Sequence, residues 1–487
     1  MMSEKNKPGV FKSFLDYFYG NFIVLLLGLV STPLITRLMS TDEYGRTAMF
    51  QSVVSIIYIF AILGLDQGYI RYFYREKISR KKLFYQCLYP ALFLILFLSS
   101  VYFIFSGLFN NILFERNSED VTFLVILYVI TSVFERFLFL NIRMDQKGKL
   151  YSNLNILSKV LYISFIALFA IVLGDDFRVV LYALTLPLFI VTLGLMIRFV
   201  IINRKEKISV FRADEFSITE KELLKYSIPF IPMLLMEWLL SSMDKWSIRF
   251  FNDFSETGVY SAAMQIMTII LTVKITFVAF WSPIAMEKYE NESEEKCKTF
   301  FSDMFLKTQF LCMCLAFGLT ICRGIIVLML GEKYRDAIKI IPFLTLMPVL
   351  SILFEMTGQG VKFVKKIKYF NYASFAAIIC NLIGNAILVP RLKGVGAAIA
   401  TGITYIVYFA IGTFFANKCY PVDYKLKTLI LSLIIYIGYA GYATYTDNQI
   451  ISAAVGVVLL MIHILLNYKT VGSLCSLIKG MIKKEDK

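Results

Sequence analysis

This sequence contains almost no histidine and no hydrophilic stretch long enough to fold as a soluble domain. Its single histidine, His463, lies inside an apolar run, so packing explains it better than metal binding. Cys312 and Cys314 are close in sequence, but residues two apart on a helix face different directions. There is no P-loop, no HExxH motif and no nucleophile elbow. These absences predict a protein with no metal site, no disulfide framework, no cofactor and no enzymatic activity.

Long apolar runs fill the chain instead. Hydrophobic residues make up 58% of the 487 positions, and the mean hydropathy is +0.68. A helix needs about 20 apolar residues to cross the bilayer core. Fourteen runs satisfy this condition: 17–38, 46–65, 83–106, 121–142, 151–173, 178–202, 226–248, 258–281, 300–322, 336–358, 369–390, 393–416, 426–446 and 449–468. The sequence therefore predicts an all-α polytopic membrane protein.

The basic residues predict how the chain threads the membrane. The net charge is +15, which in a soluble protein would suggest a nucleic-acid partner. Here the Lys and Arg residues divide 34 to 11 between alternate loops, with five inside the spans. Cytoplasmic loops of membrane proteins carry such an excess. The bias places both termini in the cytoplasm and removes the case for nucleic acid.

This orientation predicts a labelling result. In a cysteine-free background, a cysteine at position 208 should react with a membrane-impermeant reagent only after the membrane is permeabilised, because the 203–221 loop is expected to be cytoplasmic. Ready labelling in intact cells would overturn the orientation.

A weak internal repeat divides the chain. An acidic residue precedes Gly45 by two positions after the first span, and another precedes Gly258 by two positions after the seventh. The repeat predicts two pseudo-symmetric six-helix lobes, 17–202 and 226–416, joined by a cytoplasmic linker at 203–225. Two further helices at 417–468 and cytoplasmic ends at 1–16 and 469–487 complete the expected organisation. A coincidence of turn chemistry is the alternative, since this pattern is common at helix starts.

Four stretches resemble one family of membrane proteins, the polysaccharide or O-antigen flippases (Wzx type) of the multidrug/oligosaccharidyl-lipid/polysaccharide exporter superfamily. The stretches are Arg37–Gly45, Gly64–Tyr72, Pro229–Pro232 with Asp244, Lys245 and Gly258–Ala263, and Gly394–Thr401. Their order and spacing are more specific than any one of them alone.

The resemblance implies a two-lobed transporter of fourteen helices. It would flip an undecaprenyl-diphosphate-linked oligosaccharide across the bacterial inner membrane by alternating access, for lipopolysaccharide O-antigen or other surface polysaccharide assembly. Its partners would be the lipid-linked substrate, membrane lipids and, as candidates, a polysaccharide polymerase and the chain-length machinery. Two alternatives stay open: a cation-coupled multidrug exporter of the same fold, and an integral-membrane glycosyltransferase or polymerase. The short outer loops argue against the enzymes.

Charges inside spans are costly, so they usually line a cavity or pair with one another. The basic residues expected there are Arg136, Lys159, Lys245, Lys274 and Lys307. One interpretation is a basic cavity wall that binds a diphosphate. The other is snorkelling, in which a long side chain reaches the nearby headgroups.

The acidic residues inside spans are Asp66, Glu237, Asp244, Asp303 and Glu355. They are candidates for ion coupling, with a structural ion pair as the alternative. An outer gate is expected where the connections between spans 1–2 and 7–8 lie, near Arg37 and Arg249, because these positions match in the two repeats.

Overall fold

The computed structural model describes residues 10–75, 80–205, 218–366, 368–474 and 476. Residues 1–9, position 208 and most of the C-terminal tail lie outside them, so the orientation expected for the two termini and the linker stays a prediction. The described chain forms two compact units, Met1–Ser242 and Met243–Lys487. The boundary between the units falls inside helix α10, Phe230–Phe251.

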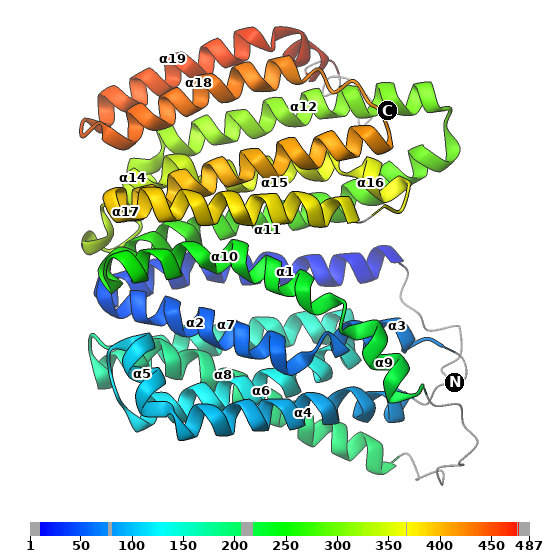
Figure 1. Cartoon of the computed structure of the whole chain (residues 1–487), viewed down its shortest axis with the longest axis vertical. Helices are drawn as coiled ribbons and strands as arrows, with labels where there is room; N and C mark the ends of the chain where they lie inside the picture. The colour runs from blue at the N-terminus through cyan, green and yellow to red at the C-terminus, as the bar shows by residue number, and fades with distance from the viewer. Residues whose placement is uncertain (1–9, 76–79, 206–217, 367, 475, 477–487) are drawn as a thin grey trace. The chain divides into compact units, whose positions relative to one another are not determined.

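The first unit consists of helices that pack side by side (Figure 1). In it α1 packs on α7, α7 on α8, and α6 on α8 and α4. Its helices are α1 Val10–Leu38, α2 Thr41–Ile62, α3 Leu65–Tyr72, α4 Arg80–Ile104, α5 Ser106–Phe114, α6 Glu119–Met144, α7 Gly148–Leu173, α8 Arg178–Lys205, α9 Glu220–Ser227 and the first part of α10.

The second unit begins inside α10 and is also built from packed helices. Its helices after α10 are α11 Phe254–Asn291, α12 Glu294–Ile321, α13 Arg323–Leu328, α14 Ala337–Leu344, α15 Leu346–Thr357, α16 Gln359–Phe363, α17 Lys368–Cys419, α18 Leu426–Tyr445 and α19 Gln449–Leu466. Helices α14 and α15 lie at its centre, among α11, α12 and α17. A short 3₁₀ turn, Glu332–Tyr334, precedes α14.

Thirteen helical segments of the described chain are long and apolar enough to cross a membrane. One of them, α17, runs for 52 residues and is broken at Lys393, where the backbone leaves the helical region (φ 53°, ψ −132°). It therefore carries two of the predicted runs, 369–390 and 393–416. The predicted fold class, an all-α polytopic membrane protein, is confirmed.

The second span is interrupted near one end. Helix α2 ends at Ile62, Leu63 and Gly64 both adopt positive φ (50° and 67°), and α3 begins at Leu65. Only glycine fits at position 64, because a Cβ there would lie 2.4 Å from the backbone oxygen of Ser227. The break places Asp66 in the first turn of a new helix.

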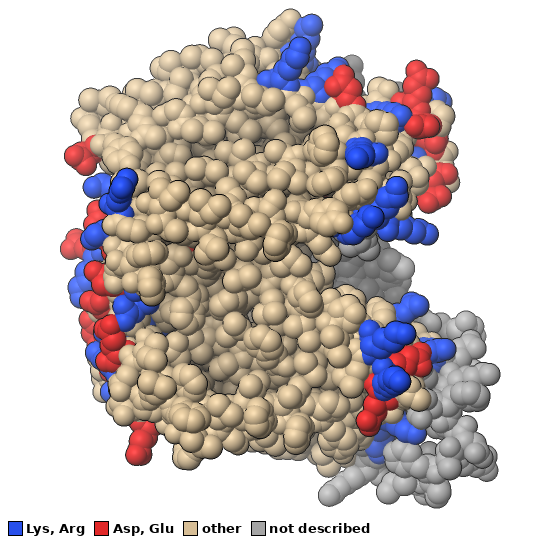
Figure 2. All heavy atoms as spheres, viewed as in Figure 1, with Lys and Arg blue, Asp and Glu red and all other residues tan. Residues whose placement is uncertain are grey.

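Within each unit, Lys, Arg, Asp and Glu gather at the two ends of the helices on the face shown in Figure 2, and a wide band between the ends is uncharged. This is the distribution expected of helices that cross a hydrocarbon layer. The few charges between the helix ends are therefore the candidates for function.

Candidate functional site

Arg136 and Asp66 form an ion pair in the first unit. Arg136 Nη2 on α6 lies 2.5 Å from Asp66 Oδ2, and its Nε lies 3.2 Å from the same oxygen. The Asp66 side chain is 6% exposed and that of Arg136 is 37% exposed. The other carboxylate oxygen, Oδ1, is buried without a hydrogen-bond partner in the described structure. The pair holds α3 against α6 just after the break in the second span.

Lys159 stands apart from acidic side chains. It lies on α7, partly exposed, with its Nζ 4.5 Å from the centre of the Tyr162 ring. Among the described residues no carboxylate forms an ion pair with it. A cation–π contact leaves the lysine's donors available to an anion.

Lys274 and Lys362 share one carboxylate in the second unit. The Glu355 side chain on α15 lies 3.2 Å from Lys274 Nζ on α11 and 3.1 Å from Lys362 Nζ on α16. All three are partly exposed, at 27%, 21% and 35% for Lys274, Glu355 and Lys362. Two lysines on one carboxylate leave an excess of one positive charge. Lys362 is not among the basic residues that the sequence predicts inside the spans.

Asp244 is the most enclosed acidic residue among the sequence candidates, at 1% exposure. Among the described residues, its carboxylate accepts hydrogen bonds from four neutral groups: Tyr260 Oη and Thr401 Oγ1 at 2.5 Å each, Asn381 Nδ2 at 3.0 Å and Asn385 Nδ2 at 2.8 Å. The Asn385 Oδ1 atom is buried with no donor in the described structure. The arrangement is a buried carboxylate that faces two hydroxyl groups and two amide NH₂ groups from α11 and α17.

The remaining candidates are Lys307 with Asp303, Lys245 and Glu237. Lys307 is 8% exposed and pairs with Asp303 one turn earlier on α12, at 2.6 Å. Lys245 follows Asp244 in sequence and is partly buried, and Glu237 is exposed on α10. The structure thus pairs Arg136 with Asp66, Lys274 with Glu355 and Lys307 with Asp303. Within either unit it does not bring the five basic candidates into one cluster.

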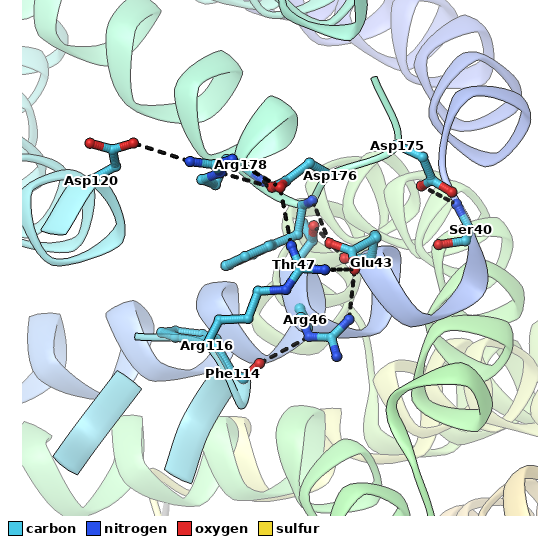
Figure 3. Close-up of polar contacts among 11 residues, drawn as sticks. Ser40, Glu43, Arg46, Thr47, Phe114, Arg116, Asp120, Asp175, Asp176 and Arg178 are labelled. Carbon is cyan, nitrogen blue, oxygen red and sulfur yellow. Dashed lines mark hydrogen bonds and ion pairs between the residues drawn. The ribbon is translucent and has the colours of Figure 1, made fainter. Parts of the chain in front are cut away.

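The first unit also contains a buried ion network, at its other end, that was not predicted from the sequence (Figure 3). Glu43, 5% exposed, is its centre. Its Oε1 accepts from Arg46 at 2.7 Å and Arg116 at 2.8 Å, and its Oε2 accepts from the backbone N–H of Phe177 at 2.8 Å. These bonds join the α1–α2 connection to the loops that precede α6 and α8.

Further bonds extend the network. Arg116 also binds Asp176 at 3.1 Å, and Asp176 binds Arg178, which reaches Asp120 at 3.1 Å. The backbone N–H of Ser40 donates to Asp175 at 2.7 Å. The available signal was Glu43 itself: a carboxylate that opens an apolar helix requires partners.

Each of the two expected gate residues lies in the last turn of a helix. Arg37 is exposed in the last turn of α1, where a cation favours the helix dipole. Arg249 lies in the last turn of α10, with its guanidinium 4.1 Å from the centre of the Phe254 ring. Next to it, Glu256 binds Lys393 at 3.0 Å. Glu43 and Glu256 each precede a glycine by two positions, and each contacts the connection between the fifth and sixth spans of its half.

The sequence was also compared with known proteins. Residues 10–287 match the model of a family described as polysaccharide biosynthesis protein. The chain belongs to this family. No curated protein matches the chain.

Several solved structures share the fold of this chain. One, titled lipid II flippase MurJ in an inward closed conformation, has a TM-score of 0.67 at 16% identity and covers 93% of this chain and 99% of its own. Another, an inward-facing multidrug resistance MATE family transporter of the MOP superfamily, has a TM-score of 0.59 at 16% identity, over 81% and 94% of the two chains. At these identities the likeness shows the fold alone.

Proposed function

We propose that this protein flips a lipid-diphosphate-linked oligosaccharide, of the undecaprenyl type, across the bacterial inner membrane for surface polysaccharide assembly such as O-antigen. The observation that carries the proposal is the family match together with a fold shared with a lipid II flippase. No chemical step is required, and alternating access of the two lobes would move the substrate. Arg37 and Arg249 would lie at the outer gate.

The basic residues would hold the diphosphate. Lys159 has a ring rather than a carboxylate as its partner, and Lys274 shares Glu355 with Lys362. These groups keep positive charge that a diphosphate can bind in a low-dielectric setting. Arg136 and Lys307 each have a carboxylate of their own, so they contribute less.

Asp244 would couple transport to an ion. Asp66, Asp303 and Glu355 are bound by cations, whereas Asp244 is bound by neutral donors, two of which are hydroxyl groups whose oxygens could also bind a cation. Hard cations prefer such oxygen ligands. A proton or a monovalent cation that binds there would neutralise a buried charge and change its hydrogen bonds.

Transport in proteoliposomes tests the proposal. Lys159→Ala and Lys274→Ala should each lower the transport of lipid-diphosphate-linked oligosaccharide by about tenfold to a hundredfold, since each removes a charge-assisted contact worth roughly 1.5–3 kcal/mol. Membrane levels should stay normal, and Arg at either position should restore part of the activity. Lys296→Ala, an exposed lysine at the start of α12, is the matched control.

Two results would contradict the proposal. Normal transport by both alanine variants would mean that these lysines only snorkel. Transport of cationic drugs by the wild-type protein, with no movement of the oligosaccharide, would favour the multidrug exporter instead.

A further inference from the structure

Helices α2 and α6 of the first unit each carry a polar face inside the span. Gln51, Ser55 and Tyr58 lie on one face of α2, and Tyr128 and Glu135 lie on one face of α6, because their spacing matches the turns of a helix. Gln51 and Ser55 are exposed, and the other three are partly exposed. Polar groups inside spans are costly against acyl chains, so these faces border water or a substrate.

Glu135 is a carboxylate that has no bonded partner among the described residues. It forms neither a hydrogen bond nor an ion pair with any of them. Arg136 follows it in sequence and attracts it electrostatically, but the Arg136 guanidinium donates its hydrogen bonds to Asp66. Both oxygens of Glu135 therefore remain available as hydrogen-bond acceptors.

Three tyrosines connect this carboxylate with Lys159. The charge of Glu135 acts on the phenols of Tyr58 and Tyr128. The phenol of Tyr128 interacts in turn with that of Tyr162, and Lys159 Nζ lies 4.5 Å from the centre of the Tyr162 ring. In the part of the chain that the structure describes, none of the three hydroxyls makes a hydrogen bond, so all three are available to a ligand.

Glu135 and Lys159 lie at similar depth in the first unit. Each is about three helical turns from the short connection between α6 and α7. The two helices pack on each other and run in opposite directions. The polar surface therefore crosses from α6 to α7 at one level, with an anion on the first helix and a cation on the second.

A neutral sugar ring matches this set of groups. Sugar hydroxyls donate and accept hydrogen bonds, as phenol hydroxyls do, and two neighbouring hydroxyls can donate to one carboxylate. A carboxylate makes these bonds charge-assisted. The C–H face of the ring can lie against tyrosine rings, which combine an apolar body with a polar tip. A cationic ligand would be repelled by Lys159, and an acidic sugar would be repelled by Glu135.

We propose that Glu135, Tyr58 and Tyr128 bind a neutral sugar of the oligosaccharide, next to the diphosphate that Lys159 holds. Glu135 accepts hydrogen bonds from two neighbouring hydroxyls of that sugar, and the two phenols donate to its oxygen atoms. Glu135 thereby determines specificity, because its charge disfavours a uronic acid at this place. The inference rests on the proposed function and adds to it the class of sugar that is recognised.

Native mass spectrometry of the full chain in detergent tests the proposal. The probes are undecaprenyl diphosphate, the same lipid linked to a neutral disaccharide, and the same lipid linked to a disaccharide whose first sugar is a uronic acid. The wild-type protein should bind the neutral glycolipid most tightly. Glu135→Gln should raise the Kd of the neutral glycolipid about tenfold, because charge-assisted hydrogen bonds are roughly twice as strong as neutral ones. The same variant should bind undecaprenyl diphosphate normally and should no longer discriminate against the uronic acid.

Further variants separate the sugar from the diphosphate. Tyr58→Phe with Tyr128→Phe keeps both rings and removes two hydroxyls, so it should weaken the binding of the neutral glycolipid by about tenfold to a hundredfold and leave undecaprenyl diphosphate unaffected. Lys159→Ala should weaken the binding of all three lipids, since all of them carry the diphosphate. Glu119→Gln and Tyr445→Phe are the matched controls, because they remove an exposed carboxylate from the first turn of α6 and an exposed hydroxyl from the second unit.

The outcomes distinguish this inference from the proposed function. Equal binding of the neutral glycolipid and undecaprenyl diphosphate by the wild-type protein would overturn the inference and leave the proposed function standing. Unchanged glycolipid binding by Glu135→Gln, or an equal loss of all three lipids in that variant, would overturn it as well. If the wild-type protein binds none of the three lipids, the proposed function fails and the inference fails with it.

Discussion

Replacing Glu43 by alanine is expected to lower the melting temperature of the protein by about 10 °C. Glu43 is buried and accepts hydrogen bonds from two arginines and from the backbone of Phe177. Removing one partner of a buried ion pair costs about 3–5 kcal/mol, because the remaining charge stays uncompensated. For a unit of this size, each kcal/mol lowers the melting temperature by about 2–4 °C. Thermal unfolding in detergent measures the shift.

Glu119→Gln is the matched control for this prediction. Glu119 is an exposed acidic residue in the first turn of α6, outside the network around Glu43. Its loss should change the melting temperature by about 4 °C or less, since a single exposed charge at a helix start contributes about 0.3–1 kcal/mol. Similar shifts for the two variants would mean that the network contributes no more than an ordinary surface charge.

Replacing Asp244 by asparagine is expected to abolish ion-coupled transport, with a loss of about a hundredfold or more, while the protein still folds. The side chain keeps its size, and the Tyr260 and Thr401 hydroxyls can rotate to accept hydrogen bonds from the new amide. The buried negative charge disappears, so a cation or proton has no counter-charge there. Transport under imposed sodium and proton gradients, each applied alone, measures the loss and identifies the ion.

Asp336→Asn serves as the control, because Asp336 is 82% exposed and its nearest cation, Lys339, is 4.0 Å away. Its transport should match that of the wild-type protein. If Asp244→Asn responds to both gradients as the wild type does, Asp244 is a structural residue and another group couples transport.

The positions of the spans could be predicted from the sequence because a single physical requirement determines them. A run of apolar residues must be long enough to cross the hydrocarbon core, and this holds for each segment independently of its neighbours. The break at Leu63 and Gly64 was harder to predict. It depends on the backbone of Ser227, which is far away in the sequence and packs against Gly64.

The candidate site was only partly predictable for the same reason. Hydropathy identifies Asp66, Asp244 and Glu355 as costly charges inside spans, but not their partners. Neutral donors such as Asn381 and Asn385 carry no charge signal in an apolar run, so the hydrogen bonds around Asp244 became visible only in the fold. Glu43 is a carboxylate at the start of an apolar helix, which is a weak signal because acidic residues are common there, and the sequence does not show that this one is buried.

The two matching carboxylates, Glu43 and Glu256, should respond differently to ionic strength. Glu43 is shielded from solvent, whereas the Glu256–Lys393 pair is 27% and 55% exposed. Dissolved salt screens exposed charges over about 8 Å at physiological concentration and affects buried pairs far less. Rising salt would therefore loosen the α10–α11 connection before it affects the α1–α2 connection, so the same solution acts unequally on the two halves of the chain.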